Sequence, residues 1–122
     1  MKINEIPIII KKFDYTFALC TFLDEFYKTE DGKKGRLLAE EPETSSLADR
    51  EYCTLAAMTH KLANDYNLDV PEWVMFNKYI MSEPVYAFNT NNTEDQNFLR
   101  MITPDEYQIR NLFLGSKILQ RV

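Results

Sequence analysis

Two long stretches with apolar residues at helical spacing constrain the fold of this chain more than any other feature. The first covers residues 7–28, and the second runs from Ser45 or Ser46 to about residue 67. Apolar side chains three and four positions apart lie on one face of a helix, and another element must cover such a face. The sequence therefore predicts two long helices within a helical bundle.

The first predicted helix has a clear start and a broad apolar face. Asn4 can cap this helix, and Pro7 suits its first turn. No glycine or further proline follows before residue 28. Because the face is broad, we expect this helix to lie at the centre of the fold. The apolar stripe comprises Ile9, Phe13, Phe17 and Cys20, and it is widened by Leu19, Phe22, Leu23 and Phe26.

The second predicted helix has one apolar side and a natural end. Its apolar side comprises Tyr52, Leu55, Ala56, Thr59, Leu62, Ala63 and Tyr66. Asn67 can end the helix because asparagine tolerates the left-handed backbone conformation. Between the two long helices, residues 29–35 are predicted to form a loop, and residues 36–41 a short helix that ends before Pro42.

Prolines break the second half of the chain into shorter pieces. Residues 71–81 are compatible with two short helical turns, and the polar, asparagine-rich residues 89–95 predict an exposed loop. With the two long helices, these pieces predict an all-α protein. We expect one irregular single-domain helical bundle over residues 1–122, with two long helices and several short ones.

The clearest local signal is the sequence Thr103-Pro104-Asp105-Glu106. It has the pattern of a capping box and predicts a helix over residues 104–112. A short last turn over residues 116–122 would give this end the outline of a helix-turn-helix, with Gly115 in the turn. Few basic residues lie there, so a DNA-binding regulator that uses residues 104–122 is a lesser hypothesis.

Composition and charge narrow the classes of function. The chain has 122 residues, of which 45% are hydrophobic, as expected for one globular domain. Its net charge of −5 opposes binding to free nucleic acid. The apolar run at residues 8–10 is far shorter than the ~20 residues of a membrane-spanning helix. We recognise no signal peptide and no dense set of cysteines, and we expect a cytoplasmic protein in which Cys20 and Cys53 are reduced.

No pattern typical of a catalytic or metal site is recognised. Cys53 and His60 would lie ~10.5 Å apart along one helix, too far to pair directly. One histidine and two distant cysteines supply no metal-ligand set, and the three glycines form no phosphate-binding motif. We therefore expect no cofactor, no metal and a non-catalytic role. The alternative is an enzyme of unrecognised type with a pocket between helices.

A pattern of aromatic, proline and arginine residues extends over nearly the whole chain. It comprises residues 22–27, residues 40–42, residues 70–74, Tyr79, Glu83-Pro84, Tyr86, Phe88, Pro104, Tyr107, Arg110-Asn111, Phe113, Leu119 and Arg121-Val122. This pattern resembles a family of small, largely uncharacterised helical proteins of bacteria, mostly Gram-positive. Members of that family are often encoded beside a nucleotidyltransferase-like gene, in the manner of a toxin and its antitoxin. The resemblance implies an antitoxin-like, protein-binding role.

The function predicted from the sequence is thus a non-catalytic protein–protein interaction module. Its expected partner is a basic protein, such as the nucleotidyltransferase-like gene neighbour, and self-association is left open. Binding energy at interfaces is often concentrated in a few aromatic and arginine side chains. The candidate partner-binding residues are Trp73, Tyr79, Tyr86 and Phe88, with Arg110 and Asn111 as weaker candidates. The four aromatic residues lie in the proline-broken stretch, where burial by the long helices is least assured.

Overall fold

The structure, a computed structural model, describes residues 1–119. Most of the elements are helices, and one two-stranded sheet joins them. The elements are η1 (Ile3–Glu5), α1 (Ile6–Ile9), α2 (Tyr15–Lys28), α3 (Asp31–Leu38), α4 (Asp49–Asp65), η2 (Glu72–Met75), η3 (Asn77–Tyr79), β1 (Val85–Tyr86), η4 (Ala87–Asn89), α5 (Thr93–Ile102), α6 (Asp105–Gln108) and β2 (Leu112–Phe113). The protein is thus mostly helical, as expected, but the predicted all-α class is not fully confirmed, because β1 and β2 form a short strand pair.

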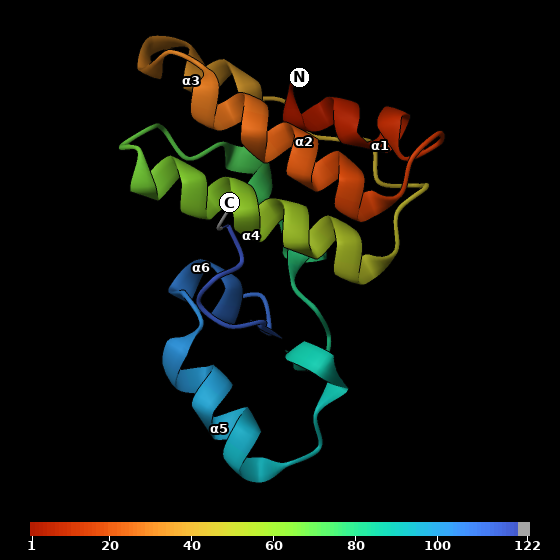
Figure 1. The fold of residues 1–122 in the computed structure, drawn as a ribbon, viewed down its shortest axis with the longest axis vertical. Helices are drawn as coiled ribbons and strands as arrows, with labels where there is room; N and C mark the ends of the chain where they lie inside the picture. The colour runs from red at the N-terminus through yellow and green to blue at the C-terminus, as the bar shows by residue number, and fades with distance from the viewer. Residues whose placement is uncertain (120–122) are drawn as a thin grey trace.

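Helix α4 lies at the centre of the fold. Figure 1 shows it between α2 on one side and α6 on the other, and it contacts η2, η3 and α6. Its buried residues are Cys53, Leu55, Ala56, Ala57, Met58, Thr59, Leu62 and Ala63. They extend around more than one stripe of the helix, as expected for a helix that is covered from several sides. The central position predicted for the first helix thus belongs to the second.

The ends of α4 were predicted with unequal success. The helix begins at Asp49, later than expected, because the Glu51 carboxylate accepts a hydrogen bond from the Ala48 backbone N–H at 2.8 Å. This bond satisfies a donor at the start of the helix, so the serines at residues 45 and 46 lie before it. The predicted end is confirmed, since Asn67 has a φ of 55°.

The single helix predicted over residues 7–28 is wrong, because the chain forms α1 and then a separate helix α2. Asp14 starts the new helix: its carboxylate accepts a hydrogen bond from the Phe17 N–H at 2.6 Å. The break changes which face is buried. Phe13 and Phe17 are about half exposed, whereas Phe22 and Phe26 are fully buried.

Residues 29–41 also differ from the prediction, since α3 covers most of the expected loop. The Lys34 side chain folds back onto the protein and donates to the Thr29 carbonyl and to the Asp31 carboxylate. Its ammonium group lies 5.6 Å from the ring centre of Phe26 and 5.3 Å from that of Tyr66. These contacts stabilise a helix that contains two glycines and that local propensity disfavours.

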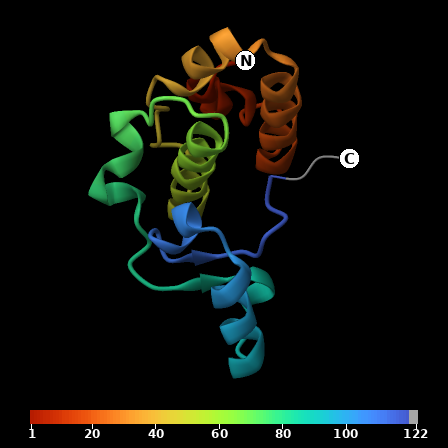
Figure 2. The same cartoon turned by 90° about the vertical axis from the view of Figure 1, so that its left-hand side faces the viewer.

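Helix α5 extends below α4 (Figure 2), whereas α6, later in the chain, packs against α4. Strands β1 and β2 pair in parallel, with Val85 opposite Leu112 and Tyr86 opposite Phe113. The two short turns predicted over residues 71–81 are confirmed as η2 and η3. Part of the loop predicted over residues 89–95 is helical, because Asn92 caps α5 by accepting from the Asp95 N–H at 3.1 Å.

The helix predicted over residues 104–112 is much shorter than expected. Thr103 does not cap α6; its hydroxyl accepts a hydrogen bond from the Gly115 N–H at 2.9 Å. The chain turns at Asn111, whose φ is 62°, and then enters β2. Residues 114–119 contain no helix, so the helix-turn-helix outline is absent from the described part of this segment. The rest of the turn predicted over residues 116–122 lies outside the described residues.

Candidate functional site

The six residues predicted to bind a partner differ greatly in exposure. Trp73 and Tyr79 are buried between η2, η3 and α4. The Trp73 indole N–H donates to the Leu38 carbonyl at 3.2 Å, and the Tyr79 hydroxyl donates to the Glu41 carboxylate at 2.5 Å. Burial and this carboxylate raise the pKa of Tyr79. Their burial therefore gives both aromatic residues a role in packing.

Tyr86 belongs to a three-residue stack that fixes β1 and α5 to β2. Its ring stacks on Phe113 with the ring centres 5.2 Å apart, and its hydroxyl accepts a hydrogen bond from Arg100 of α5. The Arg100 guanidinium lies 4.5 Å from the ring centre of Phe113. Such cation–π contacts stabilise partly exposed sites by ~0.5–1 kcal/mol. Tyr86 thus positions α5.

Phe88 is the most exposed large apolar residue among the described ones, with 99% of its surface accessible. Its backbone is left-handed, with a φ of 59°, and Asn89 beside it has a φ of 52°. A bulky residue with positive φ costs about 1–3 kcal/mol and is held there by its surroundings. The turn that presents the Phe88 ring is therefore strained, and the ring itself makes almost no packing contact within the described structure that would offset this strain.

Two more apolar side chains are exposed on the neighbouring helix α5. Phe98 is 58% exposed and Met101 is 81% exposed, and none of the residues of α5 is fully buried. Residues three positions apart lie on one helix face. Phe88 and Phe98 also line one cavity of about 430 Å³, and Asp95 is another of its lining residues. We call the exposed side chains of Phe88, Phe98 and Met101 the arm surface.

Sequence reasoning found only one of the three arm-surface residues. Phe98 and Met101 were missed because residues 89–95 were assigned to a loop, so no helix was expected to follow. A signal was present: Asn92 is a favoured capping residue, and two acidic residues follow in the first turn. The acidic residues also give the arm surface a negative edge, formed by Glu94 and Asp95.

Arg110 is buried, with only 1% of its surface accessible, and it joins three elements. Its guanidinium donates to the Glu106 carbonyl at 2.6 Å and to the Val74 carbonyl at 2.7 Å, and it contacts His60 Nδ1 at 3.2 Å. Burial lowers the pKa of Arg110, and burial together with the Arg110 charge lowers the pKa of His60. Through the Glu106 and Val74 carbonyls, Arg110 ties helix α6 to η2 inside the fold.

Asn111 has a structural role beside Arg110. Its side-chain amide donates to the Met81 carbonyl at 2.7 Å, and its backbone carbonyl accepts from the Val85 N–H at 2.8 Å. These bonds hold the strand pair against the segment that follows η3. Arg110 and Asn111 therefore organise the fold around a second surface, on which the apolar residues Met75, Phe76, Ile80 and Ile109 are each 43–56% exposed.

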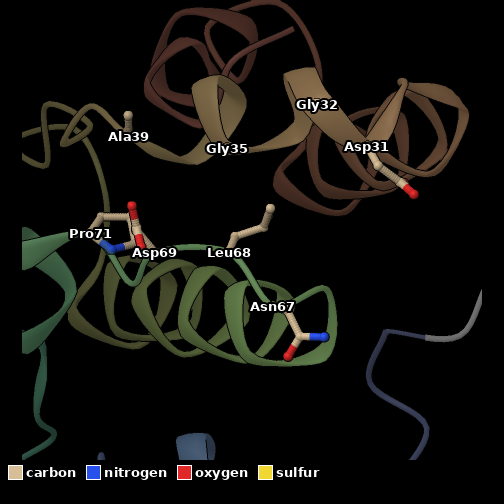
Figure 3. A pocket seen from close by; sticks show the side chains of 8 residues that line it. All are labelled: Asp31, Gly32, Gly35, Ala39, Asn67, Leu68, Asp69 and Pro71. Atoms are coloured by element: carbon tan, nitrogen blue, oxygen red, sulfur yellow. The ribbon is translucent and has the colours of Figure 1, made fainter.

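A separate cleft lies between α3 and the loop that follows α4. This cleft has a volume of about 510 Å³, and Gly32 and Gly35 form one of its walls. Figure 3 shows the Leu68 side chain pointing toward α3, while Asn67 points away from it. The Asp31 carboxylate points outward and pairs with Lys34 at 3.1 Å. The cleft thus offers mostly backbone and small side chains, with no converging set of polar groups among the residues that line it.

Metal and thiol chemistry would need clustered acidic, histidine or cysteine side chains, or a reactive thiolate. Within residues 1–119, no group of three or more His, Cys, Asp or Glu side chains could hold a metal ion. Burial raises the pKa of Cys53 to about 11, which disfavours its reactive thiolate form. Over the same residues, no helix is both long and apolar enough to span a bilayer.

Comparison with known proteins adds no relative to this picture. No protein-family model, no curated protein and no solved structure matches the chain. The family resemblance described above therefore stays a prediction.

Proposed function

We propose that this protein is an interaction module that docks on a partner protein through the arm surface. The observation that carries the proposal is Phe88, whose ring is 99% exposed on a backbone with a φ of 59°. A strained turn that holds an aromatic side chain in solvent lowers the stability of the isolated chain. Burial of that ring in a complex would offset this cost, since a phenylalanine side chain contributes about 1.5–3 kcal/mol on burial.

The chemistry of the arm surface suggests the kind of partner. Its apolar centre is bordered by Glu94 and Asp95 in the first turn of α5. The whole chain carries a net charge of −5. Electrostatic complementarity favours a partner whose apolar patch is flanked by lysine or arginine side chains. The resemblance noted in the sequence names a candidate, a nucleotidyltransferase-like gene neighbour for which this protein would act in an antitoxin-like way.

The arm surface is held in place before any partner binds. Gln96 of α5 donates to the Thr90 carbonyl at 3.0 Å, and Gln108 of α6 donates to the Arg100 carbonyl at 2.8 Å. Preorganised side chains lose little conformational entropy on binding, which raises affinity. These two hydrogen bonds fix the backbone at both ends of α5, which carries Phe98 and Met101. They therefore support a docking role for the arm surface.

The test is to co-express the protein with the nucleotidyltransferase-like neighbour and to measure the complex by native mass spectrometry and calorimetry. Phe88→Ala is expected to weaken binding about 30-fold, equivalent to ~2 kcal/mol. Ile8→Ala is a matched control, because Ile8 is 64% exposed but lies in α1, remote from the arm. The proposal fails if no complex forms, or if Phe88→Ala binds as tightly as the control variant.

A further inference from the structure

The surface beside Arg110 contains a cavity that the proposed docking role does not use. It has a volume of about 290 Å³ and is lined by Val74, Met75, Phe76, Asn77, Ile80, Ile109 and Arg110. We propose that this cavity binds a small carboxylic acid with an apolar body, and that the Arg110 guanidinium holds its carboxylate. The proposal is independent of the arm surface and of any protein partner.

The charge of Arg110 has no counter-ion in the described structure. Arginine remains protonated in proteins, and the guanidinium is almost completely buried here. Its partners are two backbone carbonyls, the Nδ1 atom of the His60 ring and the Met75 thioether. The nearest acidic residue, Glu106, turns its carboxylate to Asn64 at 2.8 Å, and no ion pair of Arg110 is found within residues 1–119. A buried cation in this state favours an anionic ligand.

One guanidinium nitrogen has a partner that a ligand can replace. Nη2 donates to the Val74 carbonyl at 2.7 Å, and its other contact is the Met75 Sδ at 3.8 Å. A thioether is a weak acceptor, whereas a carboxylate makes a short, charge-assisted hydrogen bond with arginine. Met75 is 56% exposed and unbranched, so its side chain can move into solvent. Displacement of the thioether would expose Nη2 to the cavity.

The walls of the cavity define the rest of the ligand. Phe76, Ile80 and Ile109 supply apolar contact, and Asn77 is the one uncharged polar side chain among the lining residues. Small-molecule sites typically combine apolar walls with a few polar groups that orient the ligand, and this volume lies just below their usual range, which suits a small ligand. The chemistry therefore fits a short aliphatic or aryl carboxylic acid, with its apolar part against Ile80 and Ile109.

The first test uses hexanoate as the probe and follows the methyl groups of Met75, Ile80 and Ile109 by NMR. We expect their signals to shift and saturate with hexanoate. With 1-hexanol, which has the same tail and no charge, we expect binding at least about tenfold weaker, since a hydrogen bond to a charged group is involved. Hexylamine should not bind. Equal shifts with hexanoate and 1-hexanol, or no shifts up to about 20 mM hexanoate, would overturn the proposal.

The second test introduces a glutamate side chain whose carboxylate would occupy the cavity in place of the ligand. Ile109→Glu should abolish hexanoate binding, because the new side chain can reach the guanidinium and occupy the cavity. Ile109 is 51% exposed, so the substitution leaves the core intact. Ile8→Glu adds the same charge at a remote exposed position and should bind hexanoate as the unmodified protein does. If the folded Ile109→Glu variant still binds hexanoate with unchanged affinity, the site is not at Arg110.

Discussion

Replacement of Arg110 by methionine tests whether its hydrogen bonds or its unpaired charge dominate the local energetics. The substitution keeps an unbranched side chain but leaves the Glu106 and Val74 carbonyls without the guanidinium donors that now lie 2.6 and 2.7 Å away. A buried acceptor that loses its donor costs about 1–3 kcal/mol. Removal of an unpaired buried cation offsets part of this cost. We expect Arg110→Met to lower the free energy of unfolding by about 2–4 kcal/mol.

Urea denaturation of Arg110→Met, followed by circular dichroism, measures this change. Arg50→Met is a matched control, because Arg50 is exposed on α4 and its loss should change stability by less than about 0.5 kcal/mol. An Arg110→Met variant that is as stable as the unmodified protein, or more stable, would refute the reasoning. In that case the desolvation of the Arg110 guanidinium would destabilise the fold by at least as much as its hydrogen bonds stabilise it.

Three further substitutions address single features of the fold. Burial and the Arg110 charge lower the pKa of His60, so the unfolded state binds a proton at this imidazole at a higher pH than the folded state does. The free energy of unfolding should therefore decrease as the pH falls below about 6.5. His60→Gln should reduce that decrease between about pH 7.5 and 5.5 in urea titrations. Thr59→Val should stabilise the protein by about 1 kcal/mol, because the buried hydroxyl has no hydrogen-bond partner among the described residues. Gly115→Ala should cost about 1–2 kcal/mol in a thermal melt: φ is 98°, while the added Cβ would meet only Leu99 at 3.9 Å.

The second long helix was predictable because its signal is local and repeated. Apolar residues recur over its whole length. Asn67 ends it, because asparagine tolerates the positive φ that the chain needs there. The first helix lacked such an end signal. Asp14 interrupts it without any glycine or proline nearby, and a capping aspartate in the middle of an apolar stripe has no distinct pattern.

The capping box at Thr103 failed for a different reason. The local pattern was correct for a helix start, but the hydroxyl bonds to Gly115, twelve residues later in the chain. Lys34 presents the same problem, since part of the contacts that stabilise α3 come from Phe26 of α2 and from Tyr66, which directly follows α4. Tertiary contacts of this kind override local preferences and leave no trace in spacing or composition.

The candidate site was only partly predictable because exposure depends on tertiary packing. Trp73 and Tyr79 lie in a proline-broken segment without helical periodicity, yet η2 and η3 pack that segment on α4 and bury both rings. Phe88 lies in a similar segment and is almost completely exposed. The sequence pattern around the three residues does not distinguish them, since short 3-10 turns have no regular buried face.

The arm surface and the buried arginine are linked through the short segment between α5 and β2. Gln108 of α6 donates to the carbonyls of Arg100 and Thr103, at 2.8 and 2.6 Å, and so joins the end of α5 to the turn that carries Arg110. Arg100 in turn holds the stack on Phe113 that positions β1. A change at Arg110 that loosens α6 would therefore also loosen the presentation of Phe88, although the two side chains are not in contact. Affinity at the arm surface should then fall with the stability of this segment, because less of the binding conformation is populated before the partner arrives.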